Sequence, residues 1–326
     1  MDDRFMNELR EQPSPAYARA LRERLRLRER PNEEAAAPAL RWLPLVAPAL
    51  GMAALLGVIL FPSVRVSAQA FLDLFRVRNF TAVSVDPDRV RQLEDGKLDL
   101  KALIGDRIQT VKDPGPPQVV ASAALAGAAA GIVVKVPSFL PGGLQADTVT
   151  VRGAGEARLT ADATRLRHLL EALDIRDVVV PAALDGQVIE LRAPAVVEQR
   201  FRADRRRATL LQSRSPEVSL PSGVNLADLG EIGLRILGLA PAEARRLSQT
   251  IDWRSTMLIP VPGDAGSFRR VDVRGNPALI VTSVGSSEGG HRGGGTMVLW
   301  SQGEMVYALT GNLEDADLLQ MANSVQ

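Results

Sequence analysis

The sequence predicts an α+β protein in which one transmembrane helix precedes an antiparallel-sheet extracytoplasmic domain with packed helices. Three observations carry this prediction: a long uncharged run, short alternating segments joined by glycine-bearing loops, and segments that recur in the same order, which indicates an internal duplication. We therefore divide the chain into a basic tail (1–41), a transmembrane helix (42–63), a juxtamembrane segment and linker (64–118), and two α+β repeats (119–219 and 220–326).

The uncharged run extends from Trp42 to Val64, and its centre is Leu43–Pro62. A bilayer core of about 30 Å needs roughly 20 apolar residues at helical rise, and no other segment has this length. Pro44 and Pro48 fall in the first turns, where missing N–H groups cost least. The alternative is a buried helix of a soluble domain.

Within about 20 residues of this run, arginines are more numerous before it than after it. Arg22, Arg24, Arg26, Arg28, Arg30 and Arg41 precede it, and Arg65, Arg76 and Arg78 follow. The positive-inside rule then predicts a plasma-membrane protein with a cytoplasmic N-terminus and an extracytoplasmic C-terminal domain. Cleavage after Ala70 as a signal peptide is the rival reading, but the long apolar run and the 41 residues before it favour an uncleaved anchor.

The tail can form a helix that begins at Ser14-Pro15, with serine as the N-cap. Tyr17, Leu21 and Leu25 lie four residues apart on one stripe, and arginines flank it. Such a stripe can lie on anionic lipid or dock on a partner protein, so these three are the candidate partner-binding residues. A solvated basic helix that only sets topology is the alternative.

In the juxtamembrane segment, the sequence predicts that the transmembrane helix is followed by a short helical continuation at Phe71–Phe75 and by a strand at 80–85. Asp86 and Asp88 lack the further ligands and glycine of a calcium loop, so we expect them to begin a short helix through Val90 and Leu93. Residues 113–117, with three prolines, predict a linker.

Four segment pairs carry the predicted duplication: 140–144 with 220–224, 173–176 with 251–254, 194–197 with 277–280, and 208–213 with 296–301. A strand is expected to end at Pro181 in the first copy and at Pro260 in the second. Helical periodicity predicts helices at 161–173, 242–251 and 318–325. Strands are predicted at 147–152, 187–192, 196–202, 207–212, 268–274, 278–284, 296–300 and 304–309.

Composition excludes several classes of site. The chain has no cysteine and two histidines, His168 and His291, which excludes disulfides, thiolate metal sites and multi-histidine sites. A net charge of +1 and 4% aromatic residues argue against a nucleic-acid partner. We expect no cofactor, no metal and no enzymatic activity.

Gly285–Gly289 matches the G-x-S-x-G nucleophile pattern, with His291 nearby. That pattern works on a tight strand-to-helix turn, whereas here a glycine-rich loop and another strand follow, which favours a hairpin loop. A hydrolase that uses Ser287 is therefore our third hypothesis, and His168 is expected on a helix surface.

Two charged features have structural interpretations. The basic residues at 205–207 are expected at a solvated hairpin tip, although they can also face a membrane or an acidic partner. Asp174 with Arg176, and Asp252 with Arg254, recur at the two junctions and are expected to be structural and ion-paired.

The Leu-Pro-x-Gly turns, the Ile-Asp-Trp-Arg junction at 251–254 and the ending at 299–311 resemble a bacterial extracytoplasmic domain family of uncharacterised function. That family often follows a single membrane helix in anti-sigma-factor-like proteins, and the resemblance covers roughly residues 64–326. It implies a membrane-anchored, non-enzymatic sensor whose tail contacts a cytoplasmic sigma factor or another regulator. The alternative is an envelope ligand- or lipid-binding module without such a partner.

Overall fold

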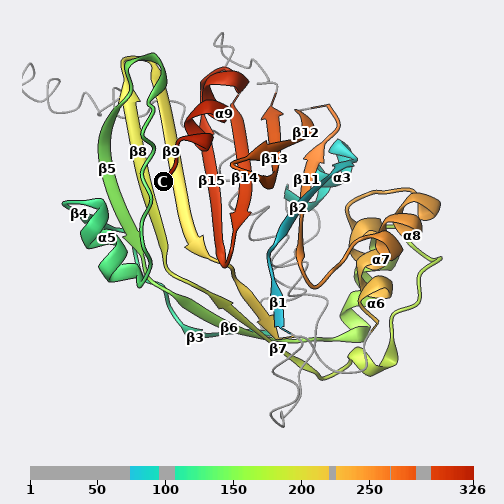
Figure 1. Ribbon diagram of the computed structural model, residues 1–326. Helices are drawn as coiled ribbons and strands as arrows, with labels where there is room; N and C mark the ends of the chain where they lie inside the picture. The colour runs from blue at the N-terminus through green and yellow to red at the C-terminus, as the bar shows by residue number, and fades with distance from the viewer. Residues whose placement is uncertain (1–73, 95–106, 220–224, 265, 284–294) are drawn as a thin grey trace, which may run out of the picture. The chain divides into compact units, whose positions relative to one another are not determined.

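The computed structural model describes residues 74–94, 107–219, 225–264, 266–283 and 295–326, which all belong to one compact unit spanning 44–326 (Figure 1). The helices are α3 (Pro87–Glu94), α5 (Ala123–Ala130), α6 (Ala163–Ala172), α7 (Leu226–Ile236), α8 (Pro241–Thr250) and α9 (Asp315–Asn323), with short 3₁₀ turns at Pro141–Gly143 and Ala182–Leu184. The strands are β1 (Leu74–Arg76), β2 (Asn79–Val85), β3 (Ile108–Lys112), β4 (Gln118–Val120), β5 (Gln145–Arg152), β6 (Gly155–Thr160), β7 (Val188–Ala193), β8 (Val196–Ala203), β9 (Arg206–Arg214), β10 (Glu217–Ser219), β11 (Thr256–Pro262), β12 (Gly266–Val273), β13 (Asn276–Ser283), β14 (Thr296–Gln302) and β15 (Met305–Gly311).

These strands form three sheets. An eight-stranded antiparallel sheet has the order β12-β13-β14-β15-β9-β8-β5-β4, and a five-stranded antiparallel sheet has the order β1-β10-β7-β6-β3. The third sheet is the parallel pair β11-β2. Antiparallel pairing follows from the short connections between neighbouring strands, such as the two-residue turn between β14 and β15.

The two larger sheets share long strands that bend rather than end. β7 continues into β8 through residues 194–195, and β9 continues into β10 through residues 215–216. The register is the same on both sides of the bend, because Arg192 pairs with Glu217 and Val196 pairs with Ser213. Proline at each break removes a ladder donor and allows the bend (Figure 1).

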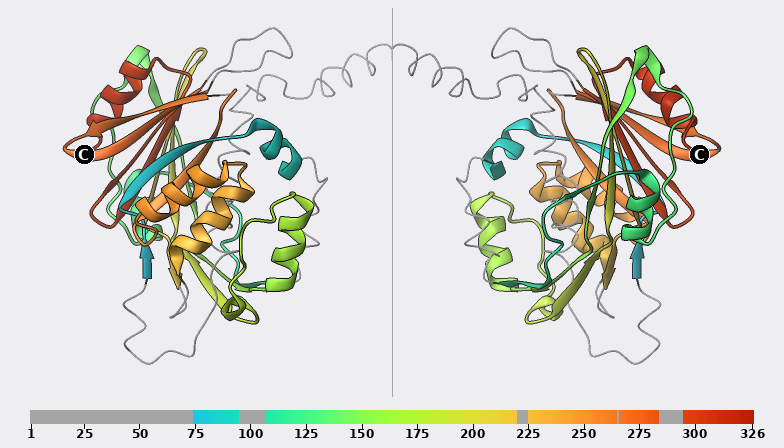
Figure 2. Two further views of the ribbon diagram at one scale, coloured as in Figure 1. Left: turned by 90° about the vertical axis from the view of Figure 1, so that its right-hand side faces the viewer. Right: turned by 90° about the vertical axis from the view of Figure 1, so that its left-hand side faces the viewer.

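Helices and the small sheet cover the bent sheet. Leucines of α6 and α7 pack on the β6, β7 and β10 end, around Leu159, Ile189 and Val218. One face of the eight-stranded sheet packs on α9 through Trp300, Leu309 and Leu318. β2 lies on the opposite face, where Ser301, the neighbour of Trp300, donates its hydroxyl to the Arg78 carbonyl (Figure 2).

The predicted fold class is wrong. Strand takes 43% and helix 27%, so antiparallel sheet rather than α+β packing dominates the described part. The longest described helix, α7, has 11 residues, and none of the helices within the described ranges is long and apolar enough to cross a membrane. The predicted transmembrane segment, 42–63, and the tail, 1–41, lie outside the described residues, so the prediction that they anchor the chain stays a prediction.

The predicted duplication is not reflected in the topology. In the first half, β7 and β8 are consecutive parts of one long bent strand, whereas their counterparts β12 and β13 fold back as a hairpin. Moreover, β9 of the first half pairs with β15 of the second along seven residues of the same sheet. The matched sequence segments therefore reflect similar local requirements of strands and turns rather than two equivalent substructures.

Most individual elements were predicted correctly within a few residues. The eight predicted strands of the body and the three helices are present, and the Asp88 N–H donates to the Asp86 carboxylate at 2.9 Å, which confirms the helix start there. Two local predictions are wrong: Leu74–Arg76 is a strand that pairs with β10, and residues 176–181 form no strand. Whether these two segments form strands depends on the availability of a pairing strand, which is a property of the tertiary structure.

A buried amide clamp holds the segment that follows α5 against the eight-stranded sheet. Gln199 and Gln212, both at most 4% exposed, donate their side-chain N–H groups to the Lys135 carbonyl at 2.8 and 2.7 Å. The backbone N–H of Lys135 donates to the side-chain oxygen Oε1 of Gln212 at 2.9 Å. Farther along, Val136 exchanges two backbone hydrogen bonds with Gln326. The segment is thereby tied both to the sheet and to the chain end.

A close approach of Trp253 to α7 organises the helical layer. A Cβ placed on Gly230 would lie 2.2 Å from the indole ring, so only glycine leaves room for it. The indole N–H donates to the Ser248 carbonyl at 2.7 Å, which ties the ring to α8. Trp253 thus fills the space between α7 and α8 and the strand β11 that follows it.

We predict that Gln212→Leu lowers the free energy of unfolding by about 1–3 kcal/mol, because a buried backbone N–H of Lys135 loses its acceptor. Urea denaturation of the purified protein measures this. Gln109→Leu, at an exposed position of β3, is the control and should change stability by less than about 0.5 kcal/mol. Equal effects of the two variants would contradict the clamp.

We predict that Gly230→Ala destabilises the protein by roughly 1–3 kcal/mol, because the new methyl group collides with the Trp253 ring. The same substitution in a Trp253→Leu background should cost clearly less, since the smaller side chain leaves room. Thermal unfolding of the four proteins of this cycle gives the coupling energy. Additive effects would show that the indole does not require glycine here.

Candidate ligand-binding groove

An open groove of about 640 Å³ lies on the sheet face that also carries α5 and the segment after it. Its wall residues come from α5 and its C-terminal turn, from the clamped segment, from the end of β9 and from the β14–β15 hairpin. They are Gly127, Ala128, Gly131, Ile132, Val133, Lys135, Arg214, Gln302, Glu304, Met305 and Tyr307. The volume lies in the range of small-molecule sites.

The first wall is α5, which sequence reasoning missed. Ser122 caps its N-terminus by accepting the Leu125 N–H, and Gly131 ends it in a left-handed conformation with φ 66°. A Cβ at Gly127 would lie 2.7 Å from the Ile132 carbonyl oxygen, so glycine allows the chain to double back tightly. The sequence nevertheless contains the usual signals of a helix here: a serine at the N-cap, an alanine-rich run of high helix propensity and a glycine at the C-terminal end.

The second wall is the β14–β15 hairpin. Trp300 and Tyr307 are cross-strand partners, and their rings stack at a centroid distance of 4.9 Å and an interplanar angle of 7°. Each is 2% exposed, and burial raises the pKa of the Tyr307 phenol. Stacking on Trp300 helps to hold the Tyr307 ring in place at the groove wall, because aromatic pairs stabilise a structure beyond the energy of area burial.

The two groove cations, Lys135 and Arg214, lack carboxylate partners among the described residues. The Lys135 ammonium donates to the neutral Gln302 amide at 2.6 Å and lies 5.9 Å from the centre of the Tyr307 ring. Arg214 donates to the Gly131 carbonyl at 3.0 Å. The groove carboxylate, Glu304, is paired at 3.0 Å with Arg76, which lies outside the groove wall. The groove therefore carries an excess of positive charge.

Large apolar side chains are exposed to solvent in the part of the chain that supplies α5 and the following segment to the groove wall. They are Val119, Leu125, Val133, Val136 and Phe139, with exposed fractions from 37% to 86%. All five belong to the stretch 119–139, whose only charged residue is Lys135. Apolar side chains concentrated in one segment, beside a groove, are typical of a binding surface.

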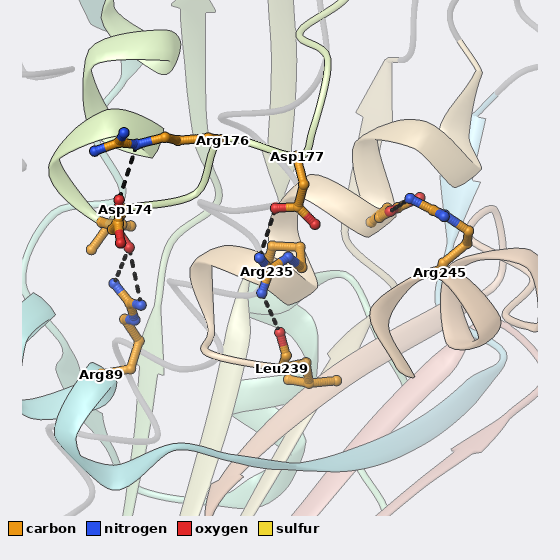
Figure 3. Close-up of polar contacts among 9 residues, drawn as sticks. Arg89, Asp174, Arg176, Asp177, Arg235, Leu239 and Arg245 are labelled. Atoms are coloured by element: carbon orange, nitrogen blue, oxygen red, sulfur yellow. Dashed lines mark hydrogen bonds and ion pairs between the residues drawn. The ribbon is translucent and has the colours of Figure 1, made fainter. Parts of the chain in front are cut away.

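A separate polar junction joins α6, α7 and α8 (Figure 3). Arg235, whose side chain is 14% exposed, donates to Asp177 at 2.8 Å and to the Leu239 carbonyl at 2.7 Å. The Arg235 hydrogen bond lowers the pKa of the Asp177 carboxyl. Arg245 pairs with Glu231 at 3.2 Å. Both arginines have carboxylate partners, although the buried Nε of Arg235 donates to no acceptor, and we interpret the junction as structural.

The same junction contains the predicted Asp174–Arg176 pair, which is present at 3.0 Å. Arg89 of α3 donates to the neighbouring Leu173 carbonyl with two N–H groups at 3.3 Å. In the second junction, Asp252 instead accepts the Arg254 backbone N–H at 3.1 Å and the Ser255 hydroxyl. The predicted ion pair is therefore present at the first junction, whereas at the second junction Asp252 accepts hydrogen bonds within its own turn.

The remaining sequence-predicted sites divide into two groups. Tyr17, Leu21, Leu25, Ser287 and His291 lie outside the described residues. His168 is exposed on α6, and the basic residues 205–207 lie at the β8–β9 turn, as predicted. Within the described ranges, no three His, Asp or Glu side chains converge in a way that would hold a metal ion.

We predict that Asp177→Asn destabilises the protein at pH 7 and that this difference disappears in acid. The folded-state pKa of Asp177 is lowered, so its contribution is present above the unfolded value of about 3.9 and is lost as pH falls through the folded value. Urea denaturation at pH 7 and pH 3 measures this. Asp174→Asn, whose pair is 82% exposed on both sides, is the control and should have little effect.

Comparisons with known proteins add no family to this description. The chain matched no protein-family model, no curated protein and no solved structure. The resemblance to extracytoplasmic domains of anti-sigma-factor-like proteins therefore stays a prediction, and function has to be argued from the groove itself.

Proposed function

We propose that this protein is a non-enzymatic envelope sensor whose domain binds a ligand in the groove and transmits its occupancy toward the N-terminal part of the chain. One observation supports this proposal above the others. The β14–β15 hairpin forms a wall of the groove and also holds residues 76–78, which lie close to the start of the described part of the chain at Leu74.

Four contacts make this connection. The Arg76 side chain pairs with Glu304 at 3.0 Å, and the Ser301 hydroxyl donates to the Arg78 carbonyl. The Val77 N–H donates to the Ser215 hydroxyl at 2.6 Å, and the Ser215 N–H donates to the Glu304 carbonyl at 2.7 Å. A ligand that moves the hairpin therefore changes the contacts of residues 76–78, which is the differential contact that a sensor needs.

The output side of the proposal is residues 1–41. We place this tail in the cytoplasm and the domain outside the plasma membrane, following the arginine asymmetry of the sequence. Tyr17, Leu21 and Leu25 would contact a cytoplasmic partner, for which a sigma factor is the candidate that the sequence resemblance suggests.

A second candidate function is an envelope ligand- or lipid-binding module without a cytoplasmic partner. The exposed apolar side chains of 119–139 favour this candidate, because a surface of this kind binds apolar ligands whether or not a signal follows. The two candidates differ only in whether the tail has a partner that responds to the groove.

The decisive experiment is affinity capture from native membranes with four full-length baits. These are the wild type, a Leu21→Asp/Leu25→Asp variant, Ala128→Trp and Ala129→Trp. Ala128 lines the groove, whereas Ala129 is an exposed residue of the same helix outside its wall. We expect a cytoplasmic protein that the tail variant loses, and whose recovery changes about threefold or more with Ala128→Trp only.

Two results would contradict the sensor. If no cytoplasmic protein depends on Leu21 and Leu25, the tail has no output role, and the binding module becomes the better function. If both tryptophan variants leave recovery unchanged, the groove does not control the tail.

A further inference from the structure

We propose that the groove binds a single-chain amphiphile with an anionic head group, such as a long-chain carboxylate. This inference rests on the proposed function only in taking the groove as a binding site. It adds the chemical class of the occupant, with the head group at Lys135 and Arg214 and the chain along α5.

The charge of the groove selects an anionic head. Lys135 is half-buried, and its ammonium has a neutral amide and an aromatic face as neighbours, with no carboxylate among the described residues. Arg214 lines the same groove and uses one N–H group on a backbone carbonyl, which leaves other donors of its fork for a ligand. An anion between two such cations gains charge-assisted hydrogen bonds.

The acidic residue of the groove does not cancel this preference. Glu304 is paired with Arg76, and Arg76 also approaches Glu217 at 3.4 Å. A cationic amphiphile would have to displace Arg76 from Glu304 and would still face Lys135 and Arg214. The electrostatic preference is therefore for a negative ligand.

The apolar part of the groove favours a ligand that carries a hydrocarbon chain. Ala128, Ile132, Val133 and Met305 line it, and the exposed Leu125 lies on the same helix as Ala128. Covering these side chains removes apolar surface from water, at about 25 cal/mol for each Å². A small polar anion would leave them exposed, so an anion that carries a hydrocarbon chain fits better.

The position of the cations favours one bound molecule over a bilayer surface. Peripheral membrane helices place their cations at the rim and their apolar side chains outward. Here Lys135 is within the groove, bonded to the hairpin wall, and the space of about 640 Å³ suits a single small molecule.

Photo-crosslinking tests this inference on the full chain reconstituted in zwitterionic nanodiscs. The probe is an eighteen-carbon carboxylate with a diazirine on its chain, and the matching alcohol and trimethylammonium compounds are the head-group controls. We expect the carboxylate to label peptides that contain residues 125–135 and 302–307, about tenfold more strongly than either control. Competition by unlabelled octadecanoate should remove the label.

Three variants identify the role of the cation. Lys135→Met should reduce labelling about tenfold, and Lys135→Arg should retain it. Because the clamp uses the Lys135 backbone rather than its side chain, both variants should fold, and unchanged urea unfolding verifies this. Lys112→Met, at an exposed position of β3 outside the groove, is the matched control and should label as the wild type.

Three outcomes would overturn the inference. Equal labelling by the alcohol, or no effect of Lys135→Met, would show that the head-group charge is not recognised. Labelling confined to the exposed residues of 119–139, and increasing with anionic lipid in the nanodisc, would indicate a bilayer surface. No labelling of the groove would exclude this ligand class, while the capture experiment with Ala128→Trp would still decide the sensor function separately.

Discussion

The contact between two buried glutamine amides and the Lys135 backbone is the constraint on which the groove depends. Gln199 and Gln212 lie on the neighbouring strands β8 and β9. Together their side chains bond both the backbone N–H and the backbone carbonyl of Lys135, which lies on one face of the sheet. Buried amides without partners would be costly, so the sheet and the crossing segment require each other. The clamp thereby holds the backbone of Lys135, a residue of the groove wall, against the sheet.

The bent sheet gives this groove its connection to the rest of the chain. Because β9 continues into β10 without a change of register, the Ser215–Pro216 bend lies beside the β14–β15 hairpin and beside β1 at once. A groove wall and the entry of the chain into the domain therefore share one hairpin.

Charge pairing separates structural sites from the candidate binding site. At the helical junction, Arg235 and Arg245 have carboxylate partners, and Arg89 bonds a carbonyl at a chain reversal. In the groove, Lys135 and Arg214 bond only neutral groups among the described residues. Retaining a half-buried cation with neutral neighbours costs stability unless a ligand supplies the opposite charge, and this cost is typical of a functional site.

The sequence by itself determined most local elements, because alternation, helical periodicity and turn residues act over a few positions. It placed β5, β8, β9 and β12–β15 correctly, together with the starts of α3 and α8. It also indicated that Asp174 and Arg176 form a structural pair. The Ser122 cap and the Gly131 terminus of α5 were local signals of the same kind, although they were missed.

Only the tertiary structure decided the fold class, the absence of equivalent repeats and the groove. Each of these depends on contacts between residues far apart in sequence, such as Lys135 with Gln212, Arg76 with Glu304, and β9 with β15. The residue pattern of a segment predicts that it forms a strand. Which strand it pairs with depends on the burial and register of the whole sheet. The matched segments of the two halves were alike in local sequence, and different pairing partners gave them different topologies.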